Sequence, residues 1–200
     1  MQIIKHNTLF FLDWDDTLFP TNWVIKNNIN LSSSKNRDRH SLYFQELDRV
    51  LSKFLRKLDS LGKIIIITNA LPDWITISSL KLPDTYHLLR DIEIISARGT
   101  YRDKSNKTMD WKTMAFRDVI DREFQSTHIS NVISIGDAEY EYQALISLSN
   151  RKKDIKYLKS VRFVNNPSHD VLIDQLEVLN NAIPKIWNKY KNLDLKFNQI

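Results

Sequence analysis

The chain has 200 residues, of which 42% are hydrophobic and 26% charged, and both proportions are near the averages of globular domains. Its longest purely apolar stretches have four residues, whereas a helix that spans a bilayer needs roughly 20. Cysteine is absent, which excludes disulfides, a cysteine nucleophile and cysteine-ligated metals. We therefore expect one domain over residues 1–200, no membrane segment and, without a signal-peptide pattern at the start, a cytoplasmic location.

Short buried runs of apolar and β-branched residues recur along the chain. Each is too short for a helix and too uniformly apolar for a strand with one wet face, so each predicts a strand covered on both sides. The five predicted strands are residues 8–12, 64–68, 92–95, 132–135 and 161–164.

Helical patterns separate these strands. Between Leu47 and Leu61 apolar residues recur every three or four positions, and Gly62 follows as a typical helix end. The predicted helices are residues 41–61, 72–90 with a break at Pro83, 109–124, 138–149 and 168–180. Residues 20–40 and 98–108 lack a helical apolar face and are expected to be irregular. A core of about 8–180 would leave a helical tail at 181–200.

The alternation of strands and helices predicts an α/β fold. We expect a three-layer, Rossmann-like arrangement with a five-stranded parallel sheet and helices on both faces. In such sheets ligands bind beyond the carboxyl ends of the strands. The residues that follow each strand are therefore the first candidates for a site.

Acidic residues follow two of these strands. Asp13, Asp15 and Asp16 come after the first, and Asp137 and Glu141 come after the fourth. Carboxylates about 4 Å apart repel by roughly 4 kcal/mol at an effective dielectric constant near 20, so their convergence calls for a cation. Oxygen ligands without cysteine or a nearby histidine favour Mg²⁺ over zinc.

Four segments in order resemble the motifs of the haloacid dehalogenase (HAD)-like superfamily of phosphatases. The first is Asp-Trp-Asp-Asp-Thr-Leu at 13–18, after an apolar strand. The second is Ile-Ile-Ile-Ile-Thr-Asn at 64–69, and the fourth is Ile-Ser-Ile-Gly-Asp-Ala-Glu-Tyr-Glu at 133–141. Lys112, near the start of a predicted helix, is the best match for the third, although Lys104 and Lys107 are alternatives. The acidic Asp15 favours the phosphatases over the dehalogenases of this superfamily.

The resemblance implies a two-step hydrolysis of phosphate monoesters. Asp13 would be the nucleophile that becomes an aspartyl-phosphate, and Asp15 would be the general acid and base. Mg²⁺ would be held by Asp13, the main-chain oxygen of Asp15 and Asp137, with Glu141 acting through water or the second shell. The phosphoryl oxygens would be bound by Thr68, Asn69 and Lys112. Asp16 and Thr17 are expected to shape the turn.

Neither of the two gaps in which this superfamily carries large cap domains is long enough for one. Capless members have open sites and often act on macromolecules, which predicts a phosphoprotein or a small phosphometabolite as the substrate. The sequence Thr-Leu-Phe-Pro at 17–20 also resembles small magnesium-dependent phosphatases. A catalytically idle binding protein with this fold remains the alternative outside enzymes, although the intact Asp13, Asp15 and Asp137 weigh against it.

The excess positive charge gives a further alternative, a nucleic-acid end phosphatase. The net charge is +5, and residues 1–150 hold 19 basic and 19 acidic side chains, so the excess lies in the last fifty residues. The basic run at 151–159 is expected at the sheet edge opposite the acids, where it would be a solvated loop. Trp14, Trp74 and Trp111 are interpreted as packing residues rather than as a base-stacking platform.

Overall fold

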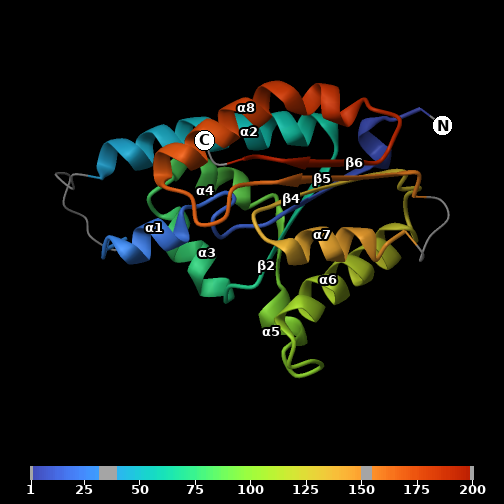
Figure 1. The fold of residues 1–200 in the computed structure, drawn as a ribbon, viewed down its shortest axis with the longest axis horizontal. Coiled ribbons are helices and arrows are strands. Elements are labelled where there is room, and N and C mark those ends of the chain that lie inside the picture. Colours follow the sequence, from blue (N-terminus) through green and yellow to red (C-terminus); the bar gives the residue numbers. More distant parts are fainter. Residues whose placement is uncertain (1, 32–39, 150–154, 199–200) are drawn as a thin grey trace.

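A six-stranded parallel sheet forms the centre of the molecule (Figure 1). In this computed structural model, which describes residues 2–31, 40–149 and 155–198, the strand order is β3-β2-β1-β4-β5-β6. The strands are β1 (Thr8–Leu12), β2 (Lys63–Thr68), β3 (Glu93–Ser96), β4 (Asn131–Gly136), β5 (Tyr157–Arg162) and β6 (Leu193–Lys196). The predicted α/β class with a parallel sheet is confirmed, but the predicted number of five strands is wrong.

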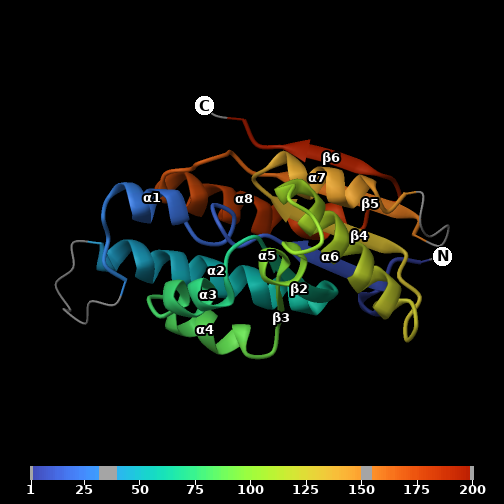
Figure 2. The same ribbon diagram turned by 90° about the horizontal axis from the view of Figure 1, so that it is seen from below.

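Helices cover both faces of the sheet. They are α1 (Thr21–Lys26), α2 (Ser41–Leu61), α3 (Pro72–Ser79), α4 (Pro83–Leu89), α5 (Ala97–Tyr101), α6 (Thr108–Glu123), α7 (Glu139–Ile146) and α8 (His169–Trp187). Alternate side chains of each strand point to opposite faces, so Phe10 and Leu12 pack in the layer that contains α2 and α8, while Leu9 and Phe11 pack against α6 and α7. Figure 2 shows the same layers from below.

The order of the strands fixes where a ligand would bind. From β1 the chain proceeds outward through β2 and β3 and then crosses to β4 on the other side of β1. The backbones of β1 and β4 pair from Thr8↔Asn131 to Leu12↔Ile135. Their carboxyl ends therefore lie side by side at the switch in strand order, which is where open α/β sheets bind ligands.

The expected helical tail at 181–200 is helical only in its first part and contains a sixth strand. Helix α8 continues to Trp187, and β6 follows and pairs with β5 in parallel. The alternation of Leu193, Leu195 and Phe197 with polar residues is the period-two signal of a half-buried edge strand. The three apolar side chains pack against the core, as this pattern predicts.

Other boundaries also differ from the sequence predictions. The helix expected at 72–90 is divided into α3 and α4, as Pro83 indicated, while α7 is shorter than predicted. Helices α1 and α5 lie in the segments that we expected to be irregular. Both have only one or two turns, too few for an apolar periodicity to be visible.

Strand β5 begins at Tyr157, earlier than the predicted start at residue 161. The prediction missed this part of the strand because a buried lysine interrupts its apolar pattern. The side chain of Lys159 is fully buried, and its Nζ donates a hydrogen bond of 2.7 Å to the carbonyl oxygen of Trp187 at the end of α8. A cation at this position also interacts favourably with the helix dipole. The prediction of a solvated basic loop is therefore wrong for Lys159, whereas Lys156 is exposed and Arg151, Lys152 and Lys153 lie outside the described residues.

Burial of Lys159 makes stability depend on pH. Loss of solvation lowers the pKa of Lys159 from 10.5 to about 8, so the unfolded chain binds more protons than the folded chain between these values. Stability relative to a Lys159→Met variant should therefore rise as the pH increases from 8 to 10.5. Unfolding by denaturant at several pH values measures this difference, and Lys156→Met is the matched control. If the free energy of unfolding of the wild type, relative to Lys159→Met, falls over this range, burial does not lower the pKa of Lys159.

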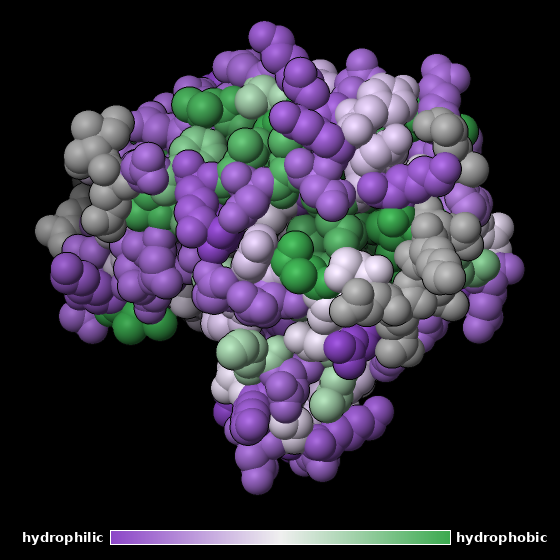
Figure 3. Space-filling view, turned by 45° about the vertical axis from the view of Figure 1, so that its right-hand side comes forward, coloured by the Kyte–Doolittle hydropathy of each residue, from purple (hydrophilic) through white to green (hydrophobic). Residues whose placement is uncertain are grey.

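Among the described residues no helix combines the length and the apolar character needed to cross a bilayer. On the face shown in Figure 3, hydrophobic residues form separate patches among hydrophilic ones.

Candidate active site

The turn after β1 is folded tightly over the end of the strand. Sheet pairing continues to Asp13, whose N–H donates to the carbonyl oxygen of Ile135 in β4 at 3.0 Å. The chain then reverses, and the N–H groups of Leu18 and Phe19 both donate to the carbonyl oxygen of Trp14. Asp16 has a φ of 55°, a left-handed conformation that aspartate tolerates better than most residues.

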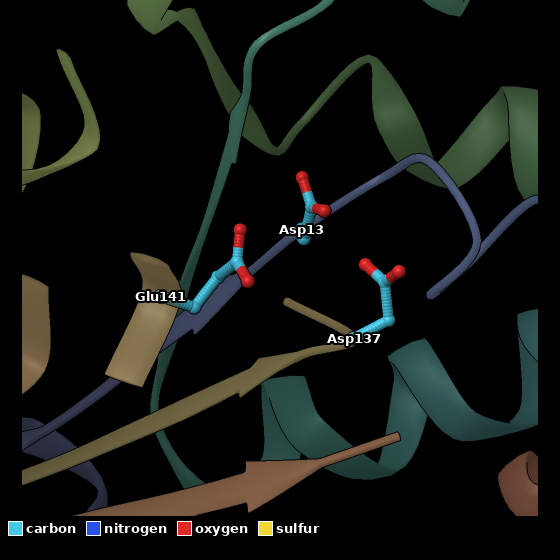
Figure 4. A group of neighbouring side chains, drawn as sticks. All are labelled: Asp13, Asp137 and Glu141. Carbon is cyan, nitrogen blue, oxygen red and sulfur yellow. The ribbon is translucent and has the colours of Figure 1, made fainter. Parts of the chain in front are cut away.

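Three carboxyl groups lie around one space at this edge of the sheet (Figure 4). Asp13 follows β1, Asp137 follows β4 and Glu141 belongs to the first turn of α7. Each offers one oxygen atom, and these atoms lie within 4.8 Å of one another. Asp13 and Glu141 are buried, and Asp137 is partly exposed. The structure thus brings together three of the five acidic residues that the sequence placed after the first and fourth predicted strands.

A single buried ammonium group compensates part of this negative charge. Lys112, which is 1% exposed, places its Nζ 2.6 Å from Oδ1 of Asp13 and in contact with Oε1 of Glu141. Its Nζ also lies 5.1 Å from the ring centre of Tyr140, a cation–π distance. Lys104 and Lys107 are exposed, so the choice of Lys112 among the three lysines agrees with the geometry.

Glu141 links Lys112 to the start of α7. While Oε1 accepts from Lys112, Oε2 accepts a hydrogen bond of 3.0 Å from the N–H of Ala138. This side chain folds back against the end of β4, where a Cβ on Gly136 would lie 2.5 Å from Cγ of Glu141. Position 136 therefore requires glycine to leave room for the glutamate. With both oxygens engaged, Glu141 positions the lysine.

The surroundings disfavour negative charge on the aspartates. Burial raises the pKa of Asp13 well above its ordinary value, and Glu141 and Asp137 add to this effect, while Lys112 opposes it. Burial likewise raises the pKa of Asp137 to about 7, with contributions from Glu141 and Asp16. For Lys112, burial acts to lower the pKa, but the carboxylates outweigh it and raise the pKa.

Asp15 lies outside this cluster and has its own set of donors. Its Oδ1 accepts from Thr21 Oγ1 at 2.5 Å and from Trp74 Nε1 at 2.7 Å. Its Oδ2 accepts from Thr68 Oγ1 at 3.2 Å. Trp74 packs edge-on against Phe19, with ring centres 6.1 Å apart. The interpretation of Trp74 as a packing residue was therefore incomplete, because its indole N–H binds a candidate catalytic carboxylate.

The two polar residues at the end of β2 differ in their surroundings. The hydroxyl of Thr68 accepts from the N–H of Ala70 at 2.9 Å and donates to Asp15. The side-chain amide of Asn69 has buried nitrogen and oxygen atoms without a hydrogen-bond partner among the described residues. Buried polar groups of this kind are rare. The free amide is thus available to a ligand at the carboxyl end of the sheet.

The turn residues Asp16 and Thr17 also make specific contacts. The carboxylate of Asp16 accepts from the main-chain N–H of Asn22 at 3.0 Å and from its side-chain amide. Thr17 Oγ1 donates to Oδ1 of Asp137 at 3.4 Å. Their expected role in shaping the turn agrees with these contacts. Thr21, Asn22 and Tyr140 were not identified from the sequence, because single polar or aromatic residues in short helices carry no motif signal.

The residues present fit a divalent cation. Asp13, Asp137 and Glu141 carry three negative charges when ionised, and Lys112 supplies one positive charge, so a charge of −2 remains uncompensated. All the acidic donors offer oxygen atoms, the ligands that Mg²⁺ prefers. A divalent metal at this edge would also offset the repulsion that raises the pKa of Asp13 and Asp137.

Removal of the buried lysine should destabilise the fold. Replacing Lys112 by methionine leaves Asp13 and Glu141 buried without their cation, and loss of one partner of a buried pair typically costs about 3 to 5 kcal/mol. The free energy of unfolding, measured with EDTA present, checks this. Lys5→Met removes a lysine whose pair with Asp59 is exposed and should cost at most about 1 kcal/mol. Equal effects of the two substitutions would contradict the buried pairing.

Comparisons with known proteins do not add to this picture. No protein-family model, curated protein or solved structure matches the chain. The function must therefore be argued from the geometry of the site and from its motifs.

Proposed function

We propose that this protein is a Mg²⁺-dependent phosphomonoesterase of the HAD type, which acts through an aspartyl-phosphate on Asp13. The observation that carries the proposal is the position of Asp13 at the end of β1, 2.6 Å from the buried ammonium of Lys112 and beside Asp137 and Glu141. The order of the four motifs supports it, because the acidic and polar motif residues lie at strand ends or in the first turn of α7, and Lys112 lies near the start of α6.

Asp13 has the contacts of a nucleophile. Its Oδ1 is bound by Lys112, and its other oxygen is available to attack phosphorus. Displacement of the alcohol would leave the phosphoryl group on Asp13, and hydrolysis of this acyl phosphate by water would restore the carboxylate. Asp15 would protonate the departing alkoxide in the first step and take a proton from water in the second.

The metal would be held by Asp13 and Asp137, with the main-chain oxygen of Asp15 as a further ligand and Glu141 in a supporting position. When bound, Mg²⁺ neutralises negative charge on the phosphoryl oxygens, so that an anionic nucleophile can approach an anionic substrate. Thr17 would orient Asp137 through the hydrogen bond to Oδ1. Lys112 would remain charged throughout, because its pKa is raised.

Binding of the phosphoryl group would use the donors that remain. The side-chain amide of Asn69 is buried and has no hydrogen-bond partner among the described residues, so it would gain one from a phosphoryl oxygen. Lys112 would contribute its charge next to the oxygen of Asp13. The Thr68 hydroxyl already donates to Asp15, so its use by the phosphoryl group would require a change of partner.

The site would accept a phosphoprotein or a small phosphorylated metabolite. Between β1 and β2 the described residues form only α1 and α2, and between β2 and β3 only α3 and α4, which fits a site without a large cap. A nucleic-acid end is less favoured as the substrate, because Lys159 is buried. The main-chain N–H of Lys156 donates to the carbonyl oxygen of Ser130 just before β4, which places Lys156 at the sheet edge opposite Asp13.

Replacing the nucleophile gives a direct test. Asp13→Asn should lower the hydrolysis of 4-nitrophenyl phosphate by about 10⁴-fold or more. It should not lower the melting temperature, because an amide of the same shape relieves repulsion between the carboxylates. Asp59→Asn, at an exposed position, is the control. Turnover retained by Asp13→Asn would exclude Asp13 as the nucleophile.

Metal removal tests the proposed dependence on Mg²⁺. EDTA should abolish hydrolysis, and added Mg²⁺ should restore it. Mg²⁺ at about 100 times its dissociation constant should also stabilise the wild-type fold by about 2.7 kcal/mol, and Asp137→Asn should reduce this effect. Thermal unfolding with and without Mg²⁺ measures it independently of activity. Full turnover after complete metal removal would contradict the site.

A further inference from the structure

We infer that Trp74 is a positioning residue for Asp15 and that it selects the carboxyl oxygen that carries the catalytic proton. The inference rests on the proposed function, because it assigns a role to the residue that would donate and accept this proton. It starts from three donors around one carboxylate, two on Oδ1 and one on Oδ2.

The donors divide the two oxygens of Asp15 into unlike atoms. Oδ1 accepts both the indole N–H of Trp74 and the hydroxyl of Thr21, at 2.7 and 2.5 Å, which occupies both of its lone pairs. Among the residues that the structure describes, Oδ2 accepts only the hydroxyl of Thr68, at 3.2 Å. One lone pair of Oδ2 therefore remains for a proton.

Trp74 differs from the two threonines in the hydrogen bonds that its side chain can form. A hydroxyl can rotate and turn from donor to acceptor, whereas an indole N–H only donates. A proton on Oδ1 would face the N–H of Trp74, and two donors cannot form a hydrogen bond with each other. The indole therefore disfavours protonation of Oδ1. Thr21 and Thr68 alone could not impose this choice.

The position of Trp74 is itself fixed by its surroundings. It lies in the first turn of α3, partly buried, and its ring packs edge-on against Phe19 in the turn after β1. Its carbonyl oxygen accepts from Ser78 Oγ at 2.7 Å. The indole N–H is therefore directed at Asp15 by contacts that do not involve a substrate.

The proton transfer balances without any further reactant. In the first step an oxygen of Asp13 bonds to phosphorus, the bond between phosphorus and the alcohol oxygen breaks, and the proton on Oδ2 moves to that oxygen. In the second step water attacks phosphorus, the bond between phosphorus and Asp13 breaks, and Oδ2 takes the proton that the water loses, which restores the acid. If Oδ1 carried the proton instead, the acid would present it in another direction.

Leaving groups that differ in their need for a proton test the inference. The ratio kcat/KM covers the steps up to release of the alcohol. Trp74→Phe should lower kcat/KM by about 10²-fold for ethyl phosphate, whose alkoxide must be protonated. For 4-nitrophenyl phosphate, whose phenolate leaves unaided, the loss should be about twofold. Equal losses for both substrates would indicate a merely structural role and overturn the inference.

Two further sets of variants separate the hydrogen bond from general damage. Trp187→Phe removes an indole N–H that donates to Thr8 at the opposite end of the sheet and should change neither value. Thr21→Val should reproduce the selective loss in part, because Oδ1 keeps the indole, and Thr21→Ser should restore activity. A Thr21→Val variant that impairs both substrates equally would also contradict the inference.

A measurement without turnover distinguishes failure of the inference from failure of the proposed function. In the ¹⁵N-labelled protein, Asp15→Ala should shift the indole N–H resonance of Trp74, assigned by its loss in Trp74→Phe, and speed its exchange with solvent. The indole resonance of Trp187 should stay unchanged. If the Trp74 resonance does not move, the hydrogen bond is absent. If it moves but the wild type hydrolyses neither phosphate, the proposed function fails and the catalytic role of Trp74 fails with it.

Discussion

The site depends on the balance between converging carboxylates and one buried ammonium group. Asp13, Asp137 and Glu141 meet at the same edge because β1 and β4 are adjacent and end together. Without a cation, three ionised carboxyl groups so close together and so poorly solvated would destabilise the fold. Lys112 removes part of the excess charge, and the remainder leaves an acidic group that could hold a metal ion.

The parallel sheet explains why these side chains lie close together. In a parallel sheet all strands end at the same edge, so one residue after each of two neighbouring strands is enough to bring distant parts of the chain together. Two helices add the remaining groups, with α7 contributing Glu141 and α6 contributing Lys112. Gly136 allows the closest of these approaches, between Glu141 and the end of β4.

Much of this arrangement was predictable from the sequence, for identifiable reasons. Buried strands with apolar runs, such as β1 and β4, carry a strong local signal, and the acids of the site stand out because they follow these strands. The order of the motifs favoured Lys112 but left Lys104 and Lys107 as alternatives, and only the structure shows that Lys112 contacts Asp13 and Glu141. The predicted catalytic roles remain proposals, because contacts alone do not show a reaction.

Two of the features that escaped prediction, the burial of Lys159 and the contact of Trp74, are decided by tertiary contacts, whereas β6 has a local pattern that is too short to stand out. Lys159 is buried in a strand because the end of α8 accepts its ammonium group, and no local signal shows that acceptor. Strand β6 is short and lies at an edge, where half of its residues are polar. The hydrogen bond between Trp74 and Asp15 joins residues 59 positions apart, and a tryptophan is most often explained by packing.

The contacts of Asp15 join two connections that leave the sheet from different strands. Thr21 belongs to the segment after β1, and Trp74 belongs to the segment after β2. Both donate to the same oxygen, so a displacement of either segment changes the environment of that atom. Among related sequences, positions 21 and 74 should consequently vary together, and a chain that replaces the tryptophan by a residue without an N–H should carry a compensating donor on the first segment.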